Sequence, residues 1–280
     1  MTYRRDSDIY TRFPFGAVVA GKKLRKSYGI SKRQMLNTKV NRPTKKKLVA
    51  WVASTCPTAV RRESYVRELT KHIPVDIYGS CGQKRCGNAE QCSTMLSRDY
   101  KFLLAFESEL CTDYVSEKMF LGLEAGVVPV VYGAADLEHF APAHSYINAR
   151  DFDSPKELAD FLLLLDSNPL LYEKYLTWQQ DYIVDRYPTK GWCDLCQKLN
   201  TQDGPEYFQF YEDIEQWWVK DVVCQSSYNI NSTAKSWLVW NAQIVDVYWW
   251  DISKEWLEFN HSYNSKNWEK KKHNIKEWLS

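Results

Sequence analysis

The sequence predicts an α/β protein built on a Rossmann-like parallel sheet. Three observations favour this fold class. The apolar run Phe102–Phe106 has the length and bulk of a buried strand, and a second such run, Val127–Tyr132, carries Pro129. Between them lie a polar turn and an apolar-periodic segment that contains Phe120 and Leu123. Strand, turn, helix and strand together make one βαβ unit.

Further strands are predicted on both sides of this unit. Leu48–Val52 is the first strand, and a helix at about 60–72 separates it from a second strand at Val75–Gly79. After the central unit we expect a turn of helix at Asp136–Phe140 and a strand at Ser145–Asn148.

Two helices are predicted after these strands. Ser154 is a suitable N-cap, Pro155 a suitable first helical residue, and Glu157 follows three residues after the cap. Asn168 and Pro169 end this helix and begin the next. We expect both helices to be scaffolding without a chemical role.

Composition limits the classes of partner. The chain has 280 residues, of which 44% are hydrophobic, which suffices for one or two domains. The net charge is only +2, but residues 1–50 hold 14 Lys and Arg against two Asp. We read 21–47 as a solvated basic connector and expect no nucleic-acid partner, because Lys45–Lys47 lack interleaved aromatic residues. No apolar run reaches the roughly 18 residues of a membrane span, and the N-terminus lacks a signal-peptide core.

Eight cysteines favour disulfide bonds and an oxidising compartment. A metal knuckle within Cys81–Cys92 or at Cys193-x-x-Cys196 is the alternative. Asn231 and Asn260 begin glycosylation sequons. The cysteines are Cys56, Cys81, Cys86, Cys92, Cys111, Cys193, Cys196 and Cys224.

Polar residues follow the first strand of the βαβ unit, at the sheet edge where ligands of open α/β sheets bind. Lys118 lies at a predicted helix N-terminus. Its positive charge and the unpaired amides of that N-terminus together suit an anion such as a diphosphate. Glu107 and Glu117 suit sugar or ribose hydroxyls instead, so the site suggests a nucleotide sugar. The alternative is that Glu117 and Lys118 are ordinary helix-surface charges.

Arg62 is a second candidate for phosphate binding. It lies in the first turn of the helix at about 60–72, where a guanidinium can grip a phosphate bidentately. The alternative is an ordinary surface arginine. Ser54 lies just upstream, in the small-residue loop 53–57 that ends the first strand.

These residues carry a family resemblance. The segments Phe106–Glu109, Asp113–Lys118 and Gly126–Val131 resemble the donor-binding motif of the α1,3-fucosyltransferases of glycosyltransferase family 10, with Ser108 where family members usually have Asn. Trp51–Ser54 and the Arg-x-x-Tyr motif that begins at Arg62 are similar to the family's strand, serine loop and pyrophosphate-binding arginine.

The N-terminal string Met1–Ile9, followed by Pro-aromatic-Gly, resembles a string from the middle of family members. The resemblance implies that about half of a complete enzyme, with membrane anchor, stem and acceptor-side domain, precedes Met1. Val75–Gly79 and the cysteines after it look most like the core N-glycan type of invertebrates and plants. In the family, the CxxC at Cys193 and Cys196 ties to the upstream domain, so here these two are expected to be free, paired with each other, or matched to a local substitute.

The resemblance implies the C-terminal, donor-binding half of a GT-B glycosyltransferase, with a basic connector at 1–46, the GDP-fucose domain at 47–224 and a tail at 225–280. It implies inverting transfer of fucose from GDP-fucose to GlcNAc of N-glycans at the Golgi membrane, with no metal cofactor. The family's general base lies in the missing half, so no catalytic residue is expected in this chain. In this scheme Arg62 and Lys118 neutralise the diphosphate, Tyr114 contacts the nucleotide, Glu117 binds hydroxyls and Ser54 lines the phosphate pocket. The expected donor-binding residues are Ser54, Arg62, Glu107, Ser108, Tyr114, Glu117 and Lys118.

The tail 225–280 lies beyond the resemblance. It holds seven Trp and neither Gly nor Pro. It is either an amphipathic helix that packs on a partner or membrane, or an unusual terminus with little stable structure. Two other functions remain open for the chain: an inactive GDP-binding protein, and a basic, aromatic partner-binding module.

Overall fold

A computed structural model of the chain describes residues 1–20, 45–201, 210–220 and 224–225. The chain divides into the compact units Met1–Ser236 and Trp237–Ser280, and the second lies wholly outside the described residues. Most of the basic connector, both sequons and the tail beyond residue 225 lie outside them as well.

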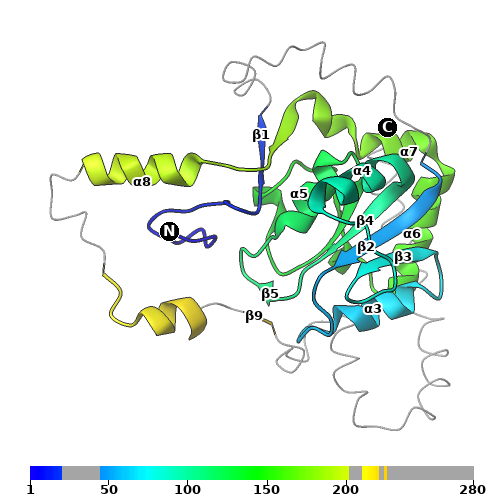
Figure 1. Cartoon of the computed structure of the whole chain (residues 1–280), viewed down its shortest axis with the longest axis horizontal. Coiled ribbons are helices and arrows are strands. Elements are labelled where there is room, and N and C mark those ends of the chain that lie inside the picture. The colour runs from blue at the N-terminus through cyan, green and yellow to red at the C-terminus, as the bar shows by residue number, and fades with distance from the viewer. Residues whose placement is uncertain (21–44, 202–209, 221–223, 226–280) are drawn as a thin grey trace, which may run out of the picture. The chain divides into compact units, whose positions relative to one another are not determined.

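Five parallel strands form the central sheet, in the order β3-β2-β4-β6-β7. Figure 1 labels the first three of these strands. This confirms the predicted α/β class with its parallel sheet. Every predicted strand is present, within a few residues of the expected bounds. The strands are β2 (Lys47–Ala53), β3 (Val75–Gly79), β4 (Tyr100–Phe106), β6 (Val128–Tyr132) and β7 (Ile147–Asn148).

The central strand β4 packs side chains on both faces of the sheet, because successive residues of a strand point in opposite directions. Leu103 and Ala105 belong to buried clusters on one face. Phe102 and Phe106 point to the other face, where their rings meet Tyr172 and Tyr65, respectively. A continuous apolar strand therefore requires helices on both sides.

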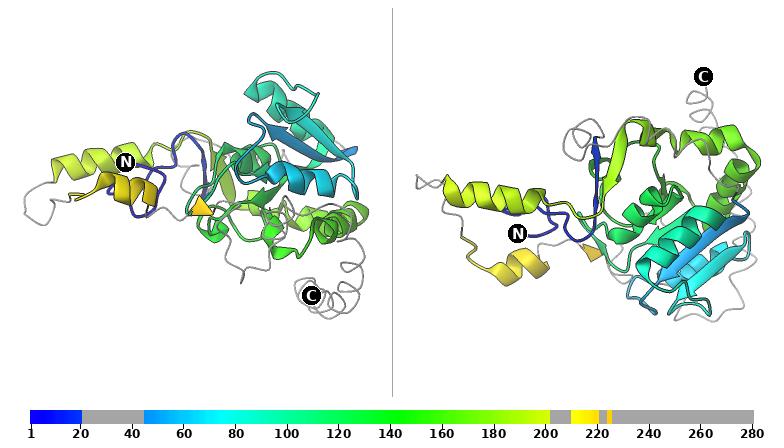
Figure 2. Two further views of the ribbon diagram at one scale, coloured as in Figure 1. Left: turned by 90° about the horizontal axis from the view of Figure 1, so that it is seen from below. Right: turned by 45° about the horizontal axis from the view of Figure 1, so that its top comes forward.

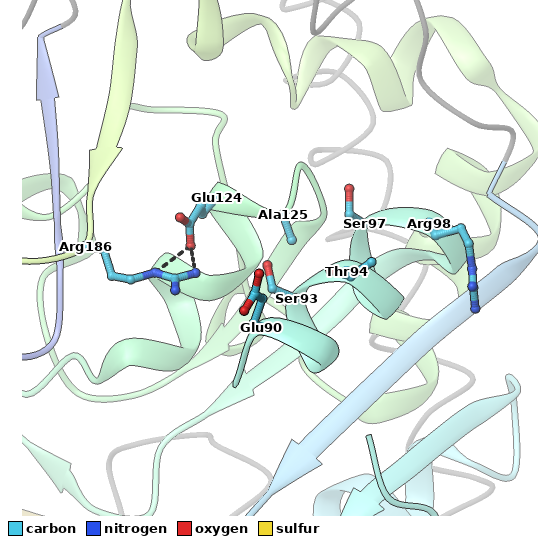
Figure 3. Close-up of a pocket in the computed structure, with 8 residues that line it drawn as sticks. All are labelled: Glu90, Ser93, Thr94, Ser97, Arg98, Glu124, Ala125 and Arg186. Carbon is cyan, nitrogen blue, oxygen red and sulfur yellow. Dashed lines mark hydrogen bonds and ion pairs between the residues drawn. The ribbon is translucent and has the colours of Figure 1, made fainter. Parts of the chain in front are cut away.

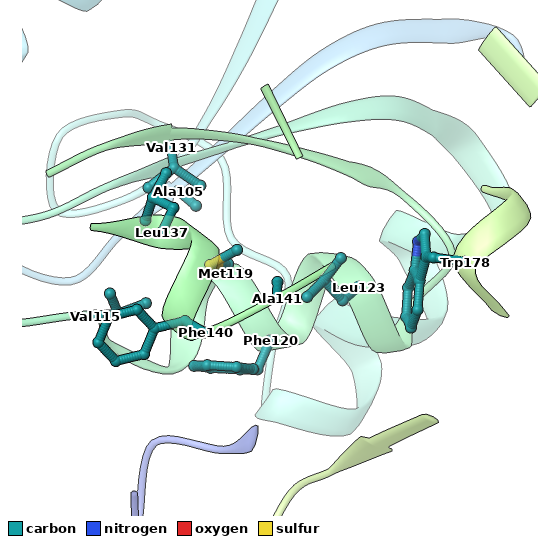
Figure 4. Packing of buried hydrophobic residues seen from close by; sticks show 10 residues of the cluster. All are labelled: Ala105, Val115, Met119, Phe120, Leu123, Val131, Leu137, Phe140, Ala141 and Trp178. Carbon is teal, nitrogen blue, oxygen red and sulfur yellow. The ribbon is translucent and has the colours of Figure 1, made fainter. Parts of the chain in front are cut away.

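The first face is covered by α4 (Ala89–Asp99) and α5 (Glu117–Glu124). Met119, Phe120 and Leu123 of α5 form a buried cluster with Ala105 and Val131 of the sheet (Figure 4). Complete burial of one large apolar side chain contributes about 1.5–3 kcal/mol. The apolar spacing of α5 therefore fixes this helix to the sheet and, with it, the position of the helix N-terminus.

The second face is covered by α3 (Arg62–Leu69), α6 (Pro155–Ser167) and α7 (Pro169–Lys174), as Figure 2 shows from two further directions. The predicted start of α6 is confirmed, because the Ser154 hydroxyl accepts a hydrogen bond from the Glu157 amide at 3.2 Å. Asn168 caps α7 in the same way, through the Leu171 amide at 3.2 Å.

Helix α4 and the helix α8 (Lys190–Asn200) were not predicted. Asn88 starts α4 with a capping box: its side chain accepts from the Gln91 amide at 2.9 Å, and the Gln91 side chain accepts from the Asn88 amide at 3.0 Å. Cysteine and glycine residues before Asn88 suggest a loop, which obscured this signal.

Two small antiparallel pairs flank the main sheet. Strand β1 (Ala17–Ala20) pairs with β8 (Tyr182–Asp185), and β5 (Leu110–Cys111) pairs with β9 (Cys224–Gln225). The remaining short elements are single turns. They are η1 (Leu137–His139), η2 (Ala149–Asp151), η3 (Thr177–Gln180) and η5 (Gln216–Lys220).

Three disulfide bonds are present, as the cysteine count predicts: Cys56–Cys81, Cys86–Cys92 and Cys111–Cys224. The alternative of a metal knuckle within Cys81–Cys92 is wrong, because these sulfurs are bonded in pairs. Cys193 and Cys196 are free and exposed, the first of the three predicted outcomes for them. Among the described residues, no helix combines the length and apolar character that crossing a bilayer requires.

Candidate functional site

The order in which strands are added to the sheet reverses between the parallel neighbours β2 and β4. From β2 the chain passes through α3 to β3 on one side, and from β4 it continues through α5 to β6 on the other. Helices leave adjacent strands in opposite directions at such a point, which opens a crevice at the carboxyl ends where open α/β sheets bind ligands. The segments that follow β2 and β4 are joined here by Arg62, which donates to the Thr55 and Phe106 carbonyls.

Glu107 directly follows β4 and is completely buried. One carboxylate oxygen, Oε1, accepts a hydrogen bond from the Ser116 amide at 2.8 Å, and Oε2 lies 3.4 Å from Nζ of Lys118. Ser116 is the N-cap of α5, where backbone amides lack helical partners and carry partial positive charge. Glu107 therefore anchors the start of α5 to the end of β4.

Lys118 is held in place at the same point. Besides the contact with Glu107, its Nζ donates to the Ser116 hydroxyl at 2.8 Å and lies 3.9 Å from a carboxylate oxygen of Glu117. The Lys118 side chain is 15% exposed, whereas that of Glu117 is 64% exposed. The surface-charge alternative is therefore wrong for Lys118, while Glu117 extends into solvent.

Arg62 is the first residue of α3, and only 1% of it is exposed, so the alternative of a surface arginine is wrong. Its Nη1 donates to the Phe106 carbonyl at 2.5 Å, and its Nη2 donates to the Thr55 carbonyl at 2.9 Å. The guanidinium thus links the ends of β4 and β2. Its Nε is buried and has no hydrogen-bond partner among the described residues; the nearest carboxylate oxygen, of Glu63, is 3.9 Å away.

The two predicted cations therefore lie at the same edge of the sheet. Arg62 contacts the backbone of Phe106, and Lys118 contacts the side chain of the next residue, Glu107. Burial lowers the pKa of Arg62, and the carboxylates of Glu63 and Glu107 oppose this shift. The arrangement places two positive charges and a helix N-terminus around one buried carboxylate.

Tyr114 belongs to an aromatic cluster that was not predicted. Its ring lies edge-on to Tyr3 at 5.5 Å and to Phe15 at 6.0 Å, both from the N-terminal segment 1–20. Burial raises the pKa of Tyr114, and the charge of Glu107 raises it further, so the phenol stays protonated at neutral pH. The family string at Met1–Ile9 was the one available signal for this contact.

The other expected residues, Ser54 and Ser108, follow β2 and β4. Ser108 is partly buried and interacts with the Tyr114 side chain. Ser54 is exposed, and its carbonyl accepts a hydrogen bond from the Ser80 hydroxyl at 2.6 Å. The turn at Gly79 requires glycine, because its φ is +91° and an added Cβ would lie 2.2 Å from the Ala53 carbonyl oxygen.

A hollow of about 520 Å³ lies elsewhere, beside α4 (Figure 3). It includes Arg186, which forms an ion pair with Glu124 near the C-terminal end of α5. None of the predicted donor-binding residues lines it. The close group Cys56, Glu63 and Cys81 is the one candidate metal cluster among the described residues, but its two sulfurs are bonded to each other.

Comparison with known proteins places these features in a family. The model of "Glycosyltransferase family 10 (fucosyltransferase) C-term" matches residues 42–217. Alpha-(1,3)-fucosyltransferase C of Drosophila melanogaster is 36% identical over 245 residues, which cover 81% of this chain and 55% of the relative. Glycoprotein 3-alpha-L-fucosyltransferase A of the same species is 37% identical over 244 residues, which cover 84% of this chain and 44% of the relative.

A solved structure, titled as an alpha1,3-fucosyltransferase with GDP-fucose, is 21% identical with a TM-score of 0.49, and covers 66% of this chain and 56% of that one. The chain spans about half the length of the relatives it matches. The match to the family model extends over more than half of the chain and includes every predicted donor-binding residue. The chain belongs to glycosyltransferase family 10, the fucosyltransferases.

Proposed function

We propose that the edge around Glu107 binds GDP-fucose and that the chain is the donor-binding half of a GT-B α1,3-fucosyltransferase. The observation that carries this proposal is the convergence of Arg62 and Lys118 on consecutive residues at the switch point of the sheet. A nucleoside diphosphate needs cations and unpaired amides at such a place. The relatives are named fucosyltransferases, which supports this choice of donor.

In the proposed reaction, an acceptor hydroxyl of GlcNAc attacks C1 of fucose from the face opposite the diphosphate. The bond from C1 to the phosphate oxygen breaks, GDP leaves, and the acceptor proton passes to a general base. Charge accumulates on the leaving diphosphate, where Lys118 and the N-terminus of α5 stabilise it. Arg62 contributes its positive charge while two of its N–H groups hold the loop carbonyls.

The remaining groups are assigned to the nucleoside and sugar parts of the donor and not to its phosphates. We assign Tyr114 to contact with the nucleotide, and Glu117, whose side chain is 64% exposed, to the sugar or ribose hydroxyls. We assign Ser108 and Ser54 to the rim of this proposed site. Glu107 is buried and already bonded, so it acts by holding Lys118 and the start of α5.

The acceptor is proposed to be GlcNAc in the core of an N-glycan. One matching relative is named a glycoprotein 3-alpha-L-fucosyltransferase, which supports a glycoprotein substrate. We also propose that the chain works at the Golgi membrane, and three disulfides fit the oxidising lumen of the secretory pathway.

Titration calorimetry with GDP tests the donor site. We expect saturable binding of GDP, no comparable binding of UDP, and loss of at least about 100-fold in affinity for Lys118→Ala, since a charged contact to phosphate is removed. Lys156→Ala is the matched control, because Lys156 is an exposed lysine of α6 paired with Asp160. Equal GDP affinity in Lys118→Ala and wild type contradicts the assignment.

A fucose-transfer assay on a core N-glycan peptide tests the reaction. The chain spans about half of its relatives, and we expect little or no turnover by the chain alone. An inactive GDP-binding protein is thus the second candidate function. Transfer that appears when the chain is part of a full-length protein supports the enzyme, whereas GDP binding without transfer in that longer protein supports the second candidate.

A further inference from the structure

We propose that Arg12 is a positioning residue for the donor loop, acting through the backbone at Val115. The inference rests on the proposed function. The donor loop, residues 113–116, carries Tyr114 and Ser116 and leads directly into α5, where Lys118 lies. Arg12 comes from the N-terminal segment 1–20, more than 100 residues away in sequence from the loop, and it is only 8% exposed.

The hydrogen bonds of Arg12 join two segments of the chain. Its Nη2 donates to the Val115 carbonyl at 2.8 Å, and its Nε donates to the Gly16 carbonyl at 3.2 Å. A planar guanidinium can reach both carbonyls at once in a fixed geometry. The Val115 carbonyl is thereby fixed immediately before Ser116, the N-cap of α5.

Aromatic rings surround the same guanidinium. Its central carbon lies 5.1 Å from the ring centre of Phe120 and 4.6 Å from that of Phe140. Phe120 belongs to α5, so Arg12 contacts both the loop and the helix that the loop begins. Gly16 brings the N-terminal segment close to this helix, since an added Cβ would lie 2.9 Å from Phe120.

A charged residue is costly at this position. Burial lowers the pKa of Arg12, and its Nη1 is buried with no hydrogen-bond partner among the described residues. An apolar side chain of similar length would fill the space without these costs. An apolar side chain could not hold the Val115 and Gly16 carbonyls or interact with the Tyr10 hydroxyl, and of these partners Val115 is the one next to the N-cap of α5.

The consequence for the site follows from the contacts of the next residues. The Ser116 amide donates a hydrogen bond to the Glu107 carboxylate, and the Ser116 hydroxyl oxygen accepts one from Nζ of Lys118. Release of Val115 therefore shifts the group that orients Lys118. Arg12 therefore affects diphosphate binding through the position of Lys118 and makes no contact with the ligand itself.

Two variants at residue 12 test the inference. Arg12→Met keeps the length of the side chain but removes every donor, and Arg12→Lys keeps the charge but loses the fork that spans two carbonyls. We expect GDP to bind about tenfold more weakly to Arg12→Met, the loss typical of a charge-assisted hydrogen bond, and Arg12→Lys to recover part of that loss. Arg186→Met is the control, because Arg186 pairs with Glu124 near the opposite end of α5.

Hydrogen–deuterium exchange separates positioning from general destabilisation. In the Arg12 variants without ligand, we expect faster exchange confined to residues 113–120, with the central strands as protected as in wild type. Unchanged GDP affinity in both Arg12 variants, or faster exchange across the whole sheet, overturns the inference. Failure of the wild-type chain to bind GDP overturns the proposed function instead, so the two failures are distinguishable. If Arg12→Met does not fold, Arg12→Lys alone decides by the same two measurements.

Discussion

At the scale of single residues, the two cations of the site are held by different partners. Arg62 is fully buried and donates hydrogen bonds to two backbone carbonyls. Lys118 is partly exposed and contacts the side chains of Glu107 and Ser116. Lys118 is therefore the more accessible of the two cations, although its contacts with Glu107 and Ser116 fix its position. Arg62 instead links the chain segments that follow β2 and β4 and contributes a buried positive charge.

Glu107→Gln tests the anchoring carboxylate. The amide oxygen can still accept from Ser116, but the charge that attracts Lys118 is lost. We expect about tenfold weaker GDP binding by calorimetry and a fall of a few degrees in Tm, because the start of α5 loses a charge-assisted bond. Glu117→Gln is the control for Tm, since Glu117 is exposed; a Tm unchanged in Glu107→Gln contradicts the anchoring role.

Asp76 gives the protein a specific sensitivity to acid. Burial alone would raise its pKa, but hydrogen bonds from Lys84, Tyr100 and Lys47 outweigh burial and lower the pKa to about 2. A carboxylate with a lowered folded-state pKa stabilises the protein above its unfolded value near 4, and this stabilisation is lost as the pH falls towards 2.

Asp76→Asn is therefore expected to lower the free energy of unfolding by about 1 kcal/mol at pH 7, allowing for solvent screening, and by almost nothing near pH 2. Urea unfolding at pH 7, 4 and 2.5 measures this difference. A gap between variant and wild type that stays constant across this range contradicts the assignment.

At the scale of elements, strands were easier to predict than helices. Buried parallel strands have continuous apolar runs, so β2, β4 and β6 could be located closely. Helix α4 has a polar sequence, and its start signal at Asn88 follows a loop rich in cysteine. The pairings β1-β8 and β5-β9 join residues far apart in sequence, which no local pattern could indicate.

Removal of the cap of α4 tests how much that helix depends on local signals. We expect Asn88→Ala to lower the free energy of unfolding by about 1 kcal/mol, because the Gln91 amide loses its acceptor. Asn88→Asp, which can accept the same bond, should remain within a few tenths of the wild-type value. Urea denaturation compares the three proteins, and equal losses in both variants would show that the cap is unimportant.

At the scale of the whole molecule, the site draws on segments distant in sequence. The pattern of strands and helix starts located Arg62, Glu107 and Lys118, and the family resemblance added Tyr114. The structure brings Arg62, Glu107 and Lys118 to one edge. Physical patterns alone did not show that Arg62 is buried, since its partners are carbonyls of other segments. The N-terminal segment could not be assigned a contact because its packing depends on the tertiary fold.

The Cys111–Cys224 disulfide closes the longest loop among the described cysteine pairs, with a sequence separation of 113. A double replacement, Cys111→Ser with Cys224→Ser, should lower the free energy of unfolding by about 2–4 kcal/mol, because the unfolded chain is freed from a large loop. Replacement of the free pair Cys193 and Cys196 by Ser is the control and should change stability little. Chemical denaturation under oxidising conditions measures both, and similar losses contradict the assigned pairing.

The central claim is that a guanosine diphosphate lies between the loops that follow β2 and β4. Hydrogen–deuterium exchange of the wild-type chain with and without saturating GDP tests it most directly. The account predicts slower exchange at residues 54–62 and 113–118, with little change around the hollow beside α4. Protection centred on that hollow, or no protection at either loop while GDP binds, would contradict it.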